Sequence, residues 1–171
     1  DNNQLTQLSL PKAIKVSCNY NFISKIYIPL VRTLSAQNNY LTDFDCPNLT
    51  GLDIKRNMLS SFEHENVRDL DCSQNMLNSL NCPMLHRLVA DENNLKYLNL
   101  PNVIYLSCNN NNLKHIDAPL LKILYYDGDC IIPLNLDNPF IIIGYREAYY
   151  SDEVEHLLDE RKNKIRAAWK I

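Results

Sequence analysis

The chain has little glycine, no long hydrophobic run and no large excess of one charge, and each absence excludes a class of protein. Its longest apolar runs, such as residues 140–143, have four residues, far below the ~20 that span a bilayer. It carries 17 Lys and Arg against 20 Asp and Glu, and this net charge of −3 shows no nucleic-acid footprint. The three glycines form no phosphate-binding loop. With 46% hydrophobic and 22% charged residues, the 171-residue chain is too apolar for a disordered segment and suits one domain.

Proline and asparagine are the residues in excess. The chain has eight prolines and 23 asparagines, and most of the prolines mark a repeat. Six of them are separated by 18 residues or by twice that spacing, with one member missing at Glu65: Pro11, Pro29, Pro47, Pro83, Pro101 and Pro119. Cutting the chain after each proline gives six 18-residue units over residues 12–119, with a half unit before them and a degenerate unit, 120–137, after them. A period held this strictly predicts a solenoid.

Each position of the unit keeps its residue type, when the residue after the proline is numbered one. Positions two, five, twelve and fifteen are apolar, and position seven is small or apolar. Position ten is asparagine in six successive units: Asn21, Asn39, Asn57, Asn75, Asn93 and Asn111. Apolar positions five and seven alternate with polar positions four, six and eight, which is the pattern of a short strand with one buried face.

The unit, L-x-x-L-x-C-x-x-N-x-L-x-x-L-x-x-P, resembles the leucine-rich repeat, whose signature is L-x-x-L-x-L-x-x-N-x-L. The resemblance covers roughly residues 1–137 and implies a solenoid of the α/β horseshoe class, here mostly β, with parallel strands on a concave face. An 18-residue unit is shorter than the usual ~20–29, which leaves no room for an outer helix of two or three turns. We therefore expect an extended or polyproline-like outer wall and slight curvature.

A left-handed β-helix with three six-residue faces is the rival architecture for an 18-residue coil. It requires apolar residues six apart, for example at positions two, eight and fourteen. Position eight is polar throughout the six units, and position fourteen includes Lys25, Asp43, Ser61 and Ser79. The sequence therefore favours the leucine-rich repeat.

The asparagine and cysteine columns both have structural explanations. A stacked amide has both a donor and an acceptor, so each Asn can serve its own turn and the next one, and the turns use Asn where Gly is scarce. Cysteines in one column are two or three units apart, which places them at roughly 10 Å or more, beyond the ~7 Å reach of a disulfide. We expect five of the six cysteines to be reduced core residues in a reducing, intracellular setting, with Cys130 undecided. The protein is then not a disulfide-bonded secreted one.

The two ends depart from the repeat. Residues 138–171 are expected to form a C-terminal cap, with a last strand over 140–143 and a helix beginning near Asp152, which has Glu155 three residues on. Asp1 enters the repeat at position eight, and we interpret the chain as a fragment or a fold whose first residues lie elsewhere.

No catalytic constellation is recognisable. The four histidines occupy unrelated positions without metal-ligand spacing, and His64 replaces an apolar residue at position seventeen. The cysteines are expected to be buried and inert. We predict that the protein is not an enzyme and that it has no cofactor or metal.

A binding surface is the better hypothesis, because the resemblance implies that the exposed strand positions form the recognition face. The expected concave-face residues are Asp53, Lys55, Asp71, Arg87, Asp91, Tyr105 and Tyr125. Exposed aromatic residues are typical interface anchors. The alternative, left open, is that the C-terminal cap covers Tyr125.

Position eleven provides a second candidate, a flank stripe of Phe22, Tyr40, Met58 and Met76 that ends at Asn94. If exposed it is a contact patch, and if partly buried it is only part of the wall. The prediction is a non-catalytic protein–protein interaction module with a protein partner, no nucleic acid and no membrane, monomeric unless it belongs to an assembly.

Two alternatives remain: a structural subunit of a larger assembly such as a virus particle, or the substrate-recognition part of a larger effector enzyme. Short repeats of this composition are similar to those of leucine-rich repeat proteins from intracellular bacteria and from large DNA viruses. The expected location is therefore intracellular, either in the cytoplasm of the producing cell or of a host, or within a virion.

Overall fold

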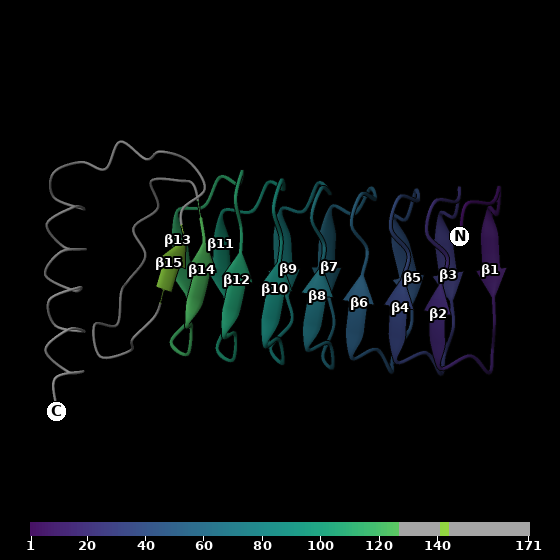
Figure 1. Ribbon diagram of the computed structural model, residues 1–171, viewed down its shortest axis with the longest axis horizontal. Coiled ribbons are helices and arrows are strands. Elements are labelled where there is room, and N and C mark those ends of the chain that lie inside the picture. The colour runs from purple at the N-terminus through teal and green to yellow at the C-terminus, as the bar shows by residue number, and fades with distance from the viewer. Residues whose placement is uncertain (127–140, 144–171) are drawn as a thin grey trace, which may run out of the picture.

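The computed structural model describes residues 1–126 and 141–143, and these form a parallel β-solenoid of about seven turns. Each turn contributes two three-residue strands, one to each of two facing walls, and the turns follow one another in a nearly straight row (Figure 1). The solenoid expected from the period is confirmed, and the row agrees with the expected slight curvature.

The long sheet forms one wall and contains positions four to six of every unit. Its strands, listed from the N-terminal end, are β2 (Lys15–Ser17), β4 (Thr33–Ser35), β6 (Gly51–Asp53), β8 (Asp69–Asp71), β10 (Arg87–Val89), β12 (Tyr105–Ser107), β14 (Ile123–Tyr125) and β15 (Ile141–Ile143). Neighbouring strands pair in parallel with a shift of 18 residues, for example Leu34 with Leu52. The middle residue of each strand from β2 to β14 is buried, and its neighbours are exposed or partly exposed except for buried Ser107. Strand β15 confirms the final strand expected near residue 140.

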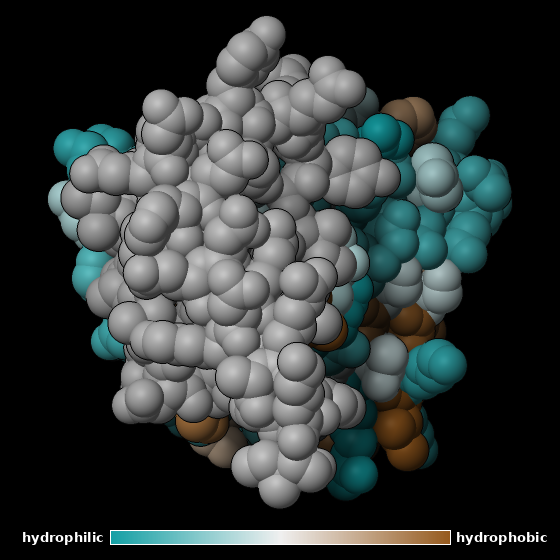
Figure 2. Space-filling view, turned by 60° about the vertical axis from the view of Figure 1, so that its left-hand side comes forward, coloured by the Kyte–Doolittle hydropathy of each residue, from teal (hydrophilic) through white to brown (hydrophobic). Residues whose placement is uncertain are grey.

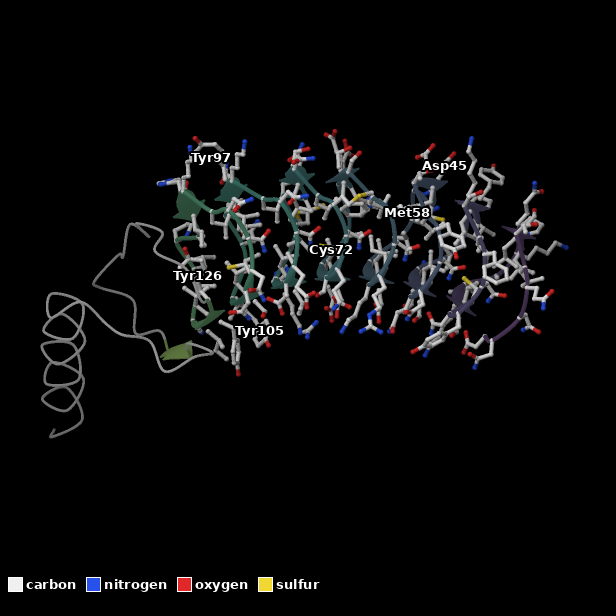
Figure 3. All side chains as sticks on the ribbon, turned by 90° about the horizontal axis from the view of Figure 1, so that it is seen from above. Asp45, Met58, Cys72, Tyr97, Tyr105 and Tyr126 are labelled. Carbon is white, nitrogen blue, oxygen red and sulfur yellow. The ribbon has the colours of Figure 1, made fainter. Side chains whose placement is uncertain are left out.

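The short wall faces the long sheet across the core (Figure 3). Its strands form three separate groups: β1 (Gln7–Ser9), β3 (Lys25–Tyr27) and β5 (Asp43–Asp45), then β7 (Ser61–Glu63) and β9 (Ser79–Asn81), then β11 (Tyr97–Asn99) and β13 (His115–Asp117). This wall confirms the expected extended geometry, and the described residues contain no helix. The helix expected from Asp152 lies outside the described residues.

The core lies between the walls and consists of the apolar columns read from the sequence. Side chains at positions two, five, seven, twelve, fifteen and seventeen from successive turns form one continuous buried cluster. Cys72 lies inside it, whereas Tyr105 and Tyr97 lie on opposite walls (Figure 3). Cys18, Cys46, Cys72, Cys82 and Cys108 are buried and free, which confirms the reduced cysteines expected there. Cys130 lies outside the described residues.

The asparagine column forms a hydrogen-bonded ladder through the turns after the long sheet. Asn39 shows the pattern: its Nδ2 donates to the carbonyls of Ala36 (3.2 Å) and Gln37 (3.1 Å) in its own turn and of Cys18 (3.0 Å) in the preceding one. Its Oδ1 accepts the backbone N–H of Ile23, also in the preceding turn, at 3.0 Å. The ladder confirms that each Asn serves two turns, and the second turn is the preceding one rather than the following one.

Each of these turns also contains a residue in the left-handed region at position nine, with φ between 52° and 57°. The residue types there vary and include Tyr20, Arg56 and Glu92, although the left-handed region costs a residue other than glycine ~1 kcal/mol. The backbone N–H of Tyr20 donates to the Gln37 carbonyl of the next turn at 2.9 Å, and the same bond recurs down the column. Asn occupies this left-handed position in three turns, as Asn2, Asn38 and Asn110, and other residue types occupy it in the rest. The Asn column itself lies one residue later and acts by hydrogen bonding.

The turns alternate in a two-unit pattern that divides the short wall. At position seventeen, large Ile28, His64 and Leu100 alternate with small Cys46, Cys82 and Ala118. Position two compensates, because valine follows each large residue and leucine each small one: Val31, Val67 and Val103 against Leu49, Leu85 and Leu121. The N–H groups of the three large residues donate to the next turn (Ile28 to Asp45 at 3.4 Å, for example), and the three strand groups form around these bonds. The structural period is thus 36 residues, two turns of alternating volume.

We predict that Asn93→Ala lowers the free energy of unfolding by about 3 kcal/mol, because it leaves several buried backbone groups without partners. Asn93 donates to Cys72, Ala90 and Asp91 and accepts from Leu77 N–H. The matched control is the exposed neighbour Asn94→Ala, for which a change within about 0.5 kcal/mol is expected. Urea denaturation measures both variants, and equal losses would contradict the ladder.

Candidate interaction surfaces

The long-sheet face is defined by the outward side chains at positions four, six and eight. It contains all seven residues expected at the concave face: Asp53, Lys55, Asp71, Arg87, Asp91, Tyr105 and Tyr125. Arg87 is exposed and the other six are partly exposed. They lie on neighbouring strands from β6 to β14 or directly after them, so the fold brings them together on one surface.

Asp53 and Asp71 stand opposite each other on adjacent strands β6 and β8. Asp53 accepts hydrogen bonds from the side chain of Gln37 and from Lys55 N–H (3.3 Å). Burial raises the pKa of the Asp53 carboxyl above its ordinary 3.8; these hydrogen bonds oppose the shift and the Asp71 carboxylate adds to it. Two carboxylates in register destabilise a sheet, so packing does not explain this pair.

Arg87 connects a row of charged and aromatic side chains toward the C-terminal end of the face. Its Nη1 lies 3.0 Å from Asp69 Oδ1, and its guanidinium carbon lies 5.0 Å from the centre of the Tyr105 ring. The Tyr105 and Tyr125 rings follow with centroids 5.6 Å apart. The row therefore presents two phenol rings and a cation fixed by Asp69. Asp69 was missing from the expected site, although its place exactly one unit before Arg87 was the available signal.

Asp91 has a structural task in addition to its place on the face. Its carboxylate accepts hydrogen bonds from Ser107 Oγ (2.8 Å) and from the backbone N–H of Asn109 (2.7 Å) in the next turn. Asn19 makes the equivalent contacts with Ser35 and Gln37. The Asp91 carboxylate therefore connects two successive turns. Lys55, by contrast, makes no ion pair within the described residues.

The flank stripe of Phe22, Tyr40, Met58 and Met76 lies on the edge formed by the asparagine turns. All four side chains are between 45% and 48% exposed, and the rings of Phe22 and Tyr40 stack with centroids 5.8 Å apart. The column continues into exposed Asn94 and Asn112. Of the two readings left open, the structure shows the exposed one, although exposure alone does not identify a partner.

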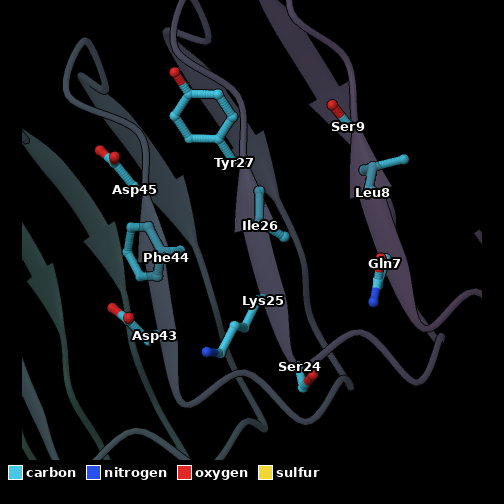
Figure 4. A pocket seen from close by; sticks show the side chains of 10 residues that line it. All are labelled: Gln7, Leu8, Ser9, Ser24, Lys25, Ile26, Tyr27, Asp43, Phe44 and Asp45. Atoms are coloured by element: carbon cyan, nitrogen blue, oxygen red, sulfur yellow. The ribbon is translucent and has the colours of Figure 1, made fainter.

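A hollow lies over β1, β3 and β5 on the short wall (Figure 4). Its rim carries Lys25, Tyr27, Asp43 and Asp45, and partly buried Phe44 contributes to its floor. The lining contains both positive and negative side chains, and the hollow is open to solvent. It therefore does not favour binding of one charge class of small ligand.

The described residues show no group of three or more His, Cys, Asp or Glu side chains that could hold a metal ion. His64 has a structural contact: its Nε2 donates to the Cys46 carbonyl at 3.0 Å, and its Nδ1 accepts the N–H of Asn66. Burial raises the pKa of the Cys18 thiol to about 11 and that of Cys82 to about 12, so both thiols stay protonated and unreactive at neutral pH.

We predict that Asp53→Asn raises the free energy of unfolding by about 0.5 kcal/mol at neutral pH, because it removes one of two opposed carboxylates. The raised pKa of Asp53 means that the folded chain holds its proton more tightly than the unfolded chain. Its charge therefore reduces stability as the pH rises through the window from 3.8 to the raised pKa, and the advantage of the variant disappears in acid.

The control for this prediction is Asp69→Asn, which removes only the exposed ion pair with Arg87 and is expected to lower stability by at most about 0.5 kcal/mol. Denaturation of all three proteins across a pH series provides the measurement. A loss of more than about 1 kcal/mol for Asp53→Asn at neutral pH would show that the fold needs this carboxylate.

No family model, curated protein or solved structure matches this chain. Its assignment as a parallel β-solenoid rests on the strand pairing and the buried columns described above. The described part of the chain also has no helix of the length and hydrophobicity needed to cross a bilayer.

Proposed function

We propose that the protein is a non-catalytic protein–protein interaction module of the leucine-rich repeat type, which binds its partner on the long-sheet face. The observation that carries the proposal is the row of Asp69, Arg87, Tyr105 and Tyr125 on strands β8 to β14. Its rings and guanidinium are positioned by one another and remain partly or fully exposed. Tyrosine and arginine are the residue types that dominate binding energy in protein interfaces.

The carboxylates of this face support the same proposal. Asp53 and Asp71 oppose each other where an uncharged pair would serve the sheet better. A partner that places a cation between them would remove the repulsion, so the pair favours a partner with a basic residue at this point. The face is about 30 Å long, since seven of its strands stack at ~4.8 Å, and this length suits a protein partner better than a small molecule.

Membership of the leucine-rich repeat family is proposed on the eleven-residue motif together with the parallel sheet formed by its first half. An intracellular location is proposed because five buried cysteines are free, as suits a reducing compartment. We propose no nucleic-acid partner. Base stacking requires aromatic side chains within a basic groove, whereas the tyrosines of the long-sheet face lie among carboxylates as well as cations.

A structural subunit of a larger assembly is the second candidate, and the flank stripe is the observation that favours it. Four apolar side chains in successive turns form an exposed line that a neighbouring subunit would cover. In this role the monomer would be an intermediate rather than the working state.

We predict that Tyr105→Ala combined with Tyr125→Ala weakens binding of the partner at least about 30-fold, because each interface tyrosine contributes on the order of 1–2 kcal/mol. The matched control is Tyr27→Ala combined with Tyr97→Ala, two exposed tyrosines on the short wall. Affinity capture with the intact chain identifies the partner, and titration then compares the three proteins. Equal binding by all three would exclude the long-sheet face.

We predict that a solenoid acting as an assembly subunit self-associates as its concentration is raised, and that Phe22→Ser with Tyr40→Ser returns it to the monomer. The physical reason is the loss of two stacked apolar rings from the exposed flank stripe. Size-exclusion chromatography with light scattering measures the mass. A wild-type chain that stays monomeric at every concentration would count against the assembly role and leave the interaction module.

A further inference from the structure

The proline turns form a continuous edge of the solenoid, opposite the asparagine turns. This proline-turn edge comprises position eighteen and positions one to three of the following unit, and it lies along the bottom of Figure 1. A hydrogen bond closes most of the turns, as from Val31 N–H to the Ile28 carbonyl at 3.3 Å. The residue at position two points into the core, and positions one and three therefore present their side chains outward.

Aliphatic side chains protrude along this edge. Five of them, between 38% and 62% exposed, come from positions one and three of five different turns: Ile14, Leu30, Met84, Ile104 and Leu120. In Figure 2, hydrophobic atoms are visible in the lower half of the surface that is not grey, the side on which the proline turns lie, with hydrophilic atoms among them. These exposed aliphatic tips occur in five of seven successive turns; the two middle turns carry polar residues at the same positions. Five in register on one edge exceed the scattered hydrophobic residues that an ordinary surface carries.

Positive charges lie among these aliphatic residues. The edge carries four exposed cations, Lys12, Arg32, Arg68 and Lys122, and one carboxylate, Glu65. Residues 1–126 as a whole contain eleven Lys and Arg and eleven Asp and Glu, so the turn residues of this edge are more positive than the described chain on average. On the short-wall side, the neighbouring position sixteen carries three exposed carboxylates, Asp45, Glu63 and Asp117. The nearest carboxylate on the long-sheet side, Asp69, is paired with Arg87.

We propose that the proline-turn edge binds the surface of a membrane that contains anionic phospholipids. The backbone of the turns ends at about one level in Figure 1. The exposed side chains at positions one and three therefore start from a common level and can meet a plane together. Such a plane attracts each cation near it and accepts shallow apolar side chains below its headgroups. Nucleic acid fits less well, because the edge presents aliphatic residues where bases would need aromatic ones.

The proposal departs from the sequence expectation of no membrane partner, which rested on the absence of a spanning segment and on the net charge. Binding along an edge requires neither a spanning segment nor a positive total. It is also independent of the proposed function: on such a membrane the two walls stand away from the lipid plane, and the long-sheet face stays accessible to a protein partner.

The experiment is sedimentation of the full chain with vesicles of phosphatidylcholine alone or mixed with phosphatidylserine. Wild type is expected to bind only the mixed vesicles. Arg32→Gln with Arg68→Gln is expected to weaken that binding about fivefold for each cation removed. Leu30→Ser with Leu120→Ser is expected to weaken it about tenfold, because the apolar contact is lost.

The matched controls lie on the short wall or directly before it. Lys96→Gln with Lys114→Gln removes two exposed cations, and Tyr27→Ser with Tyr97→Ser removes two exposed rings, and neither pair should alter vesicle binding. Circular dichroism shows that each variant is folded. The proposal is overturned if wild type does not bind mixed vesicles, if the controls reduce binding as much as the edge variants, or if the serine pair has no effect. The last outcome would leave a general attraction to polyanions, including nucleic acid and acidic proteins.

Discussion

The structure depends on how the chain satisfies its backbone where each turn leaves the long sheet. At that point the chain turns inward, and carbonyl and N–H groups are buried without strand partners. The asparagine at position ten supplies both missing functions, as Asn57 shows with donors to the Ala36 and Ile54 carbonyls and an acceptor for Leu41 N–H. Because each side chain joins its own turn to the preceding one, the same bonds that close a turn also fix the stacking distance and register.

Stacking in turn determines what each wall can do. The long sheet keeps one register through all its strands. The side chains at its outward positions do not pack in the core, so the fold restricts their type only weakly. Charged and aromatic residues such as Arg87 and Tyr105 can therefore gather there at little cost to the fold. The short wall instead accommodates alternating volumes at position seventeen, and its strands pair only within groups. The continuous surface is thus the one on which we propose that a partner binds.

Much of the fold follows from the period, because every buried column of one unit reappears 18 residues later in the same environment. The strands at positions four to six, the buried cysteines and the role of Asn39 were all predictable on that basis. The division of the short wall was not predicted from the 18-residue columns. It follows a 36-residue alternation of large and small residues at position seventeen, such as Ile28 and Cys46, and the large residues donate their backbone N–H to the next turn.

The candidate surfaces were partly predictable for a similar reason. Outward positions of a strand alternate, so Asp53 and Tyr105 could be assigned to one face, but Asp69 was passed over until its ion pair with Arg87 was visible. The proline-turn edge was hidden by averaging. Residues 1–126 contain equal numbers of basic and acidic residues, and only the stacking of the turns places Arg32 and Arg68 on the same edge as Leu120.

The central claim is that the asparagine ladder holds the turns together, and native-state hydrogen exchange tests it most directly. The backbone amides of Leu41, Leu59 and Leu77 donate to Asn57, Asn75 and Asn93 at 2.9–3.1 Å and are buried. They are expected to be among the last to exchange, through opening of the whole solenoid rather than of single turns. Exchange of these three amides as fast as that of exposed turn residues would contradict the claim.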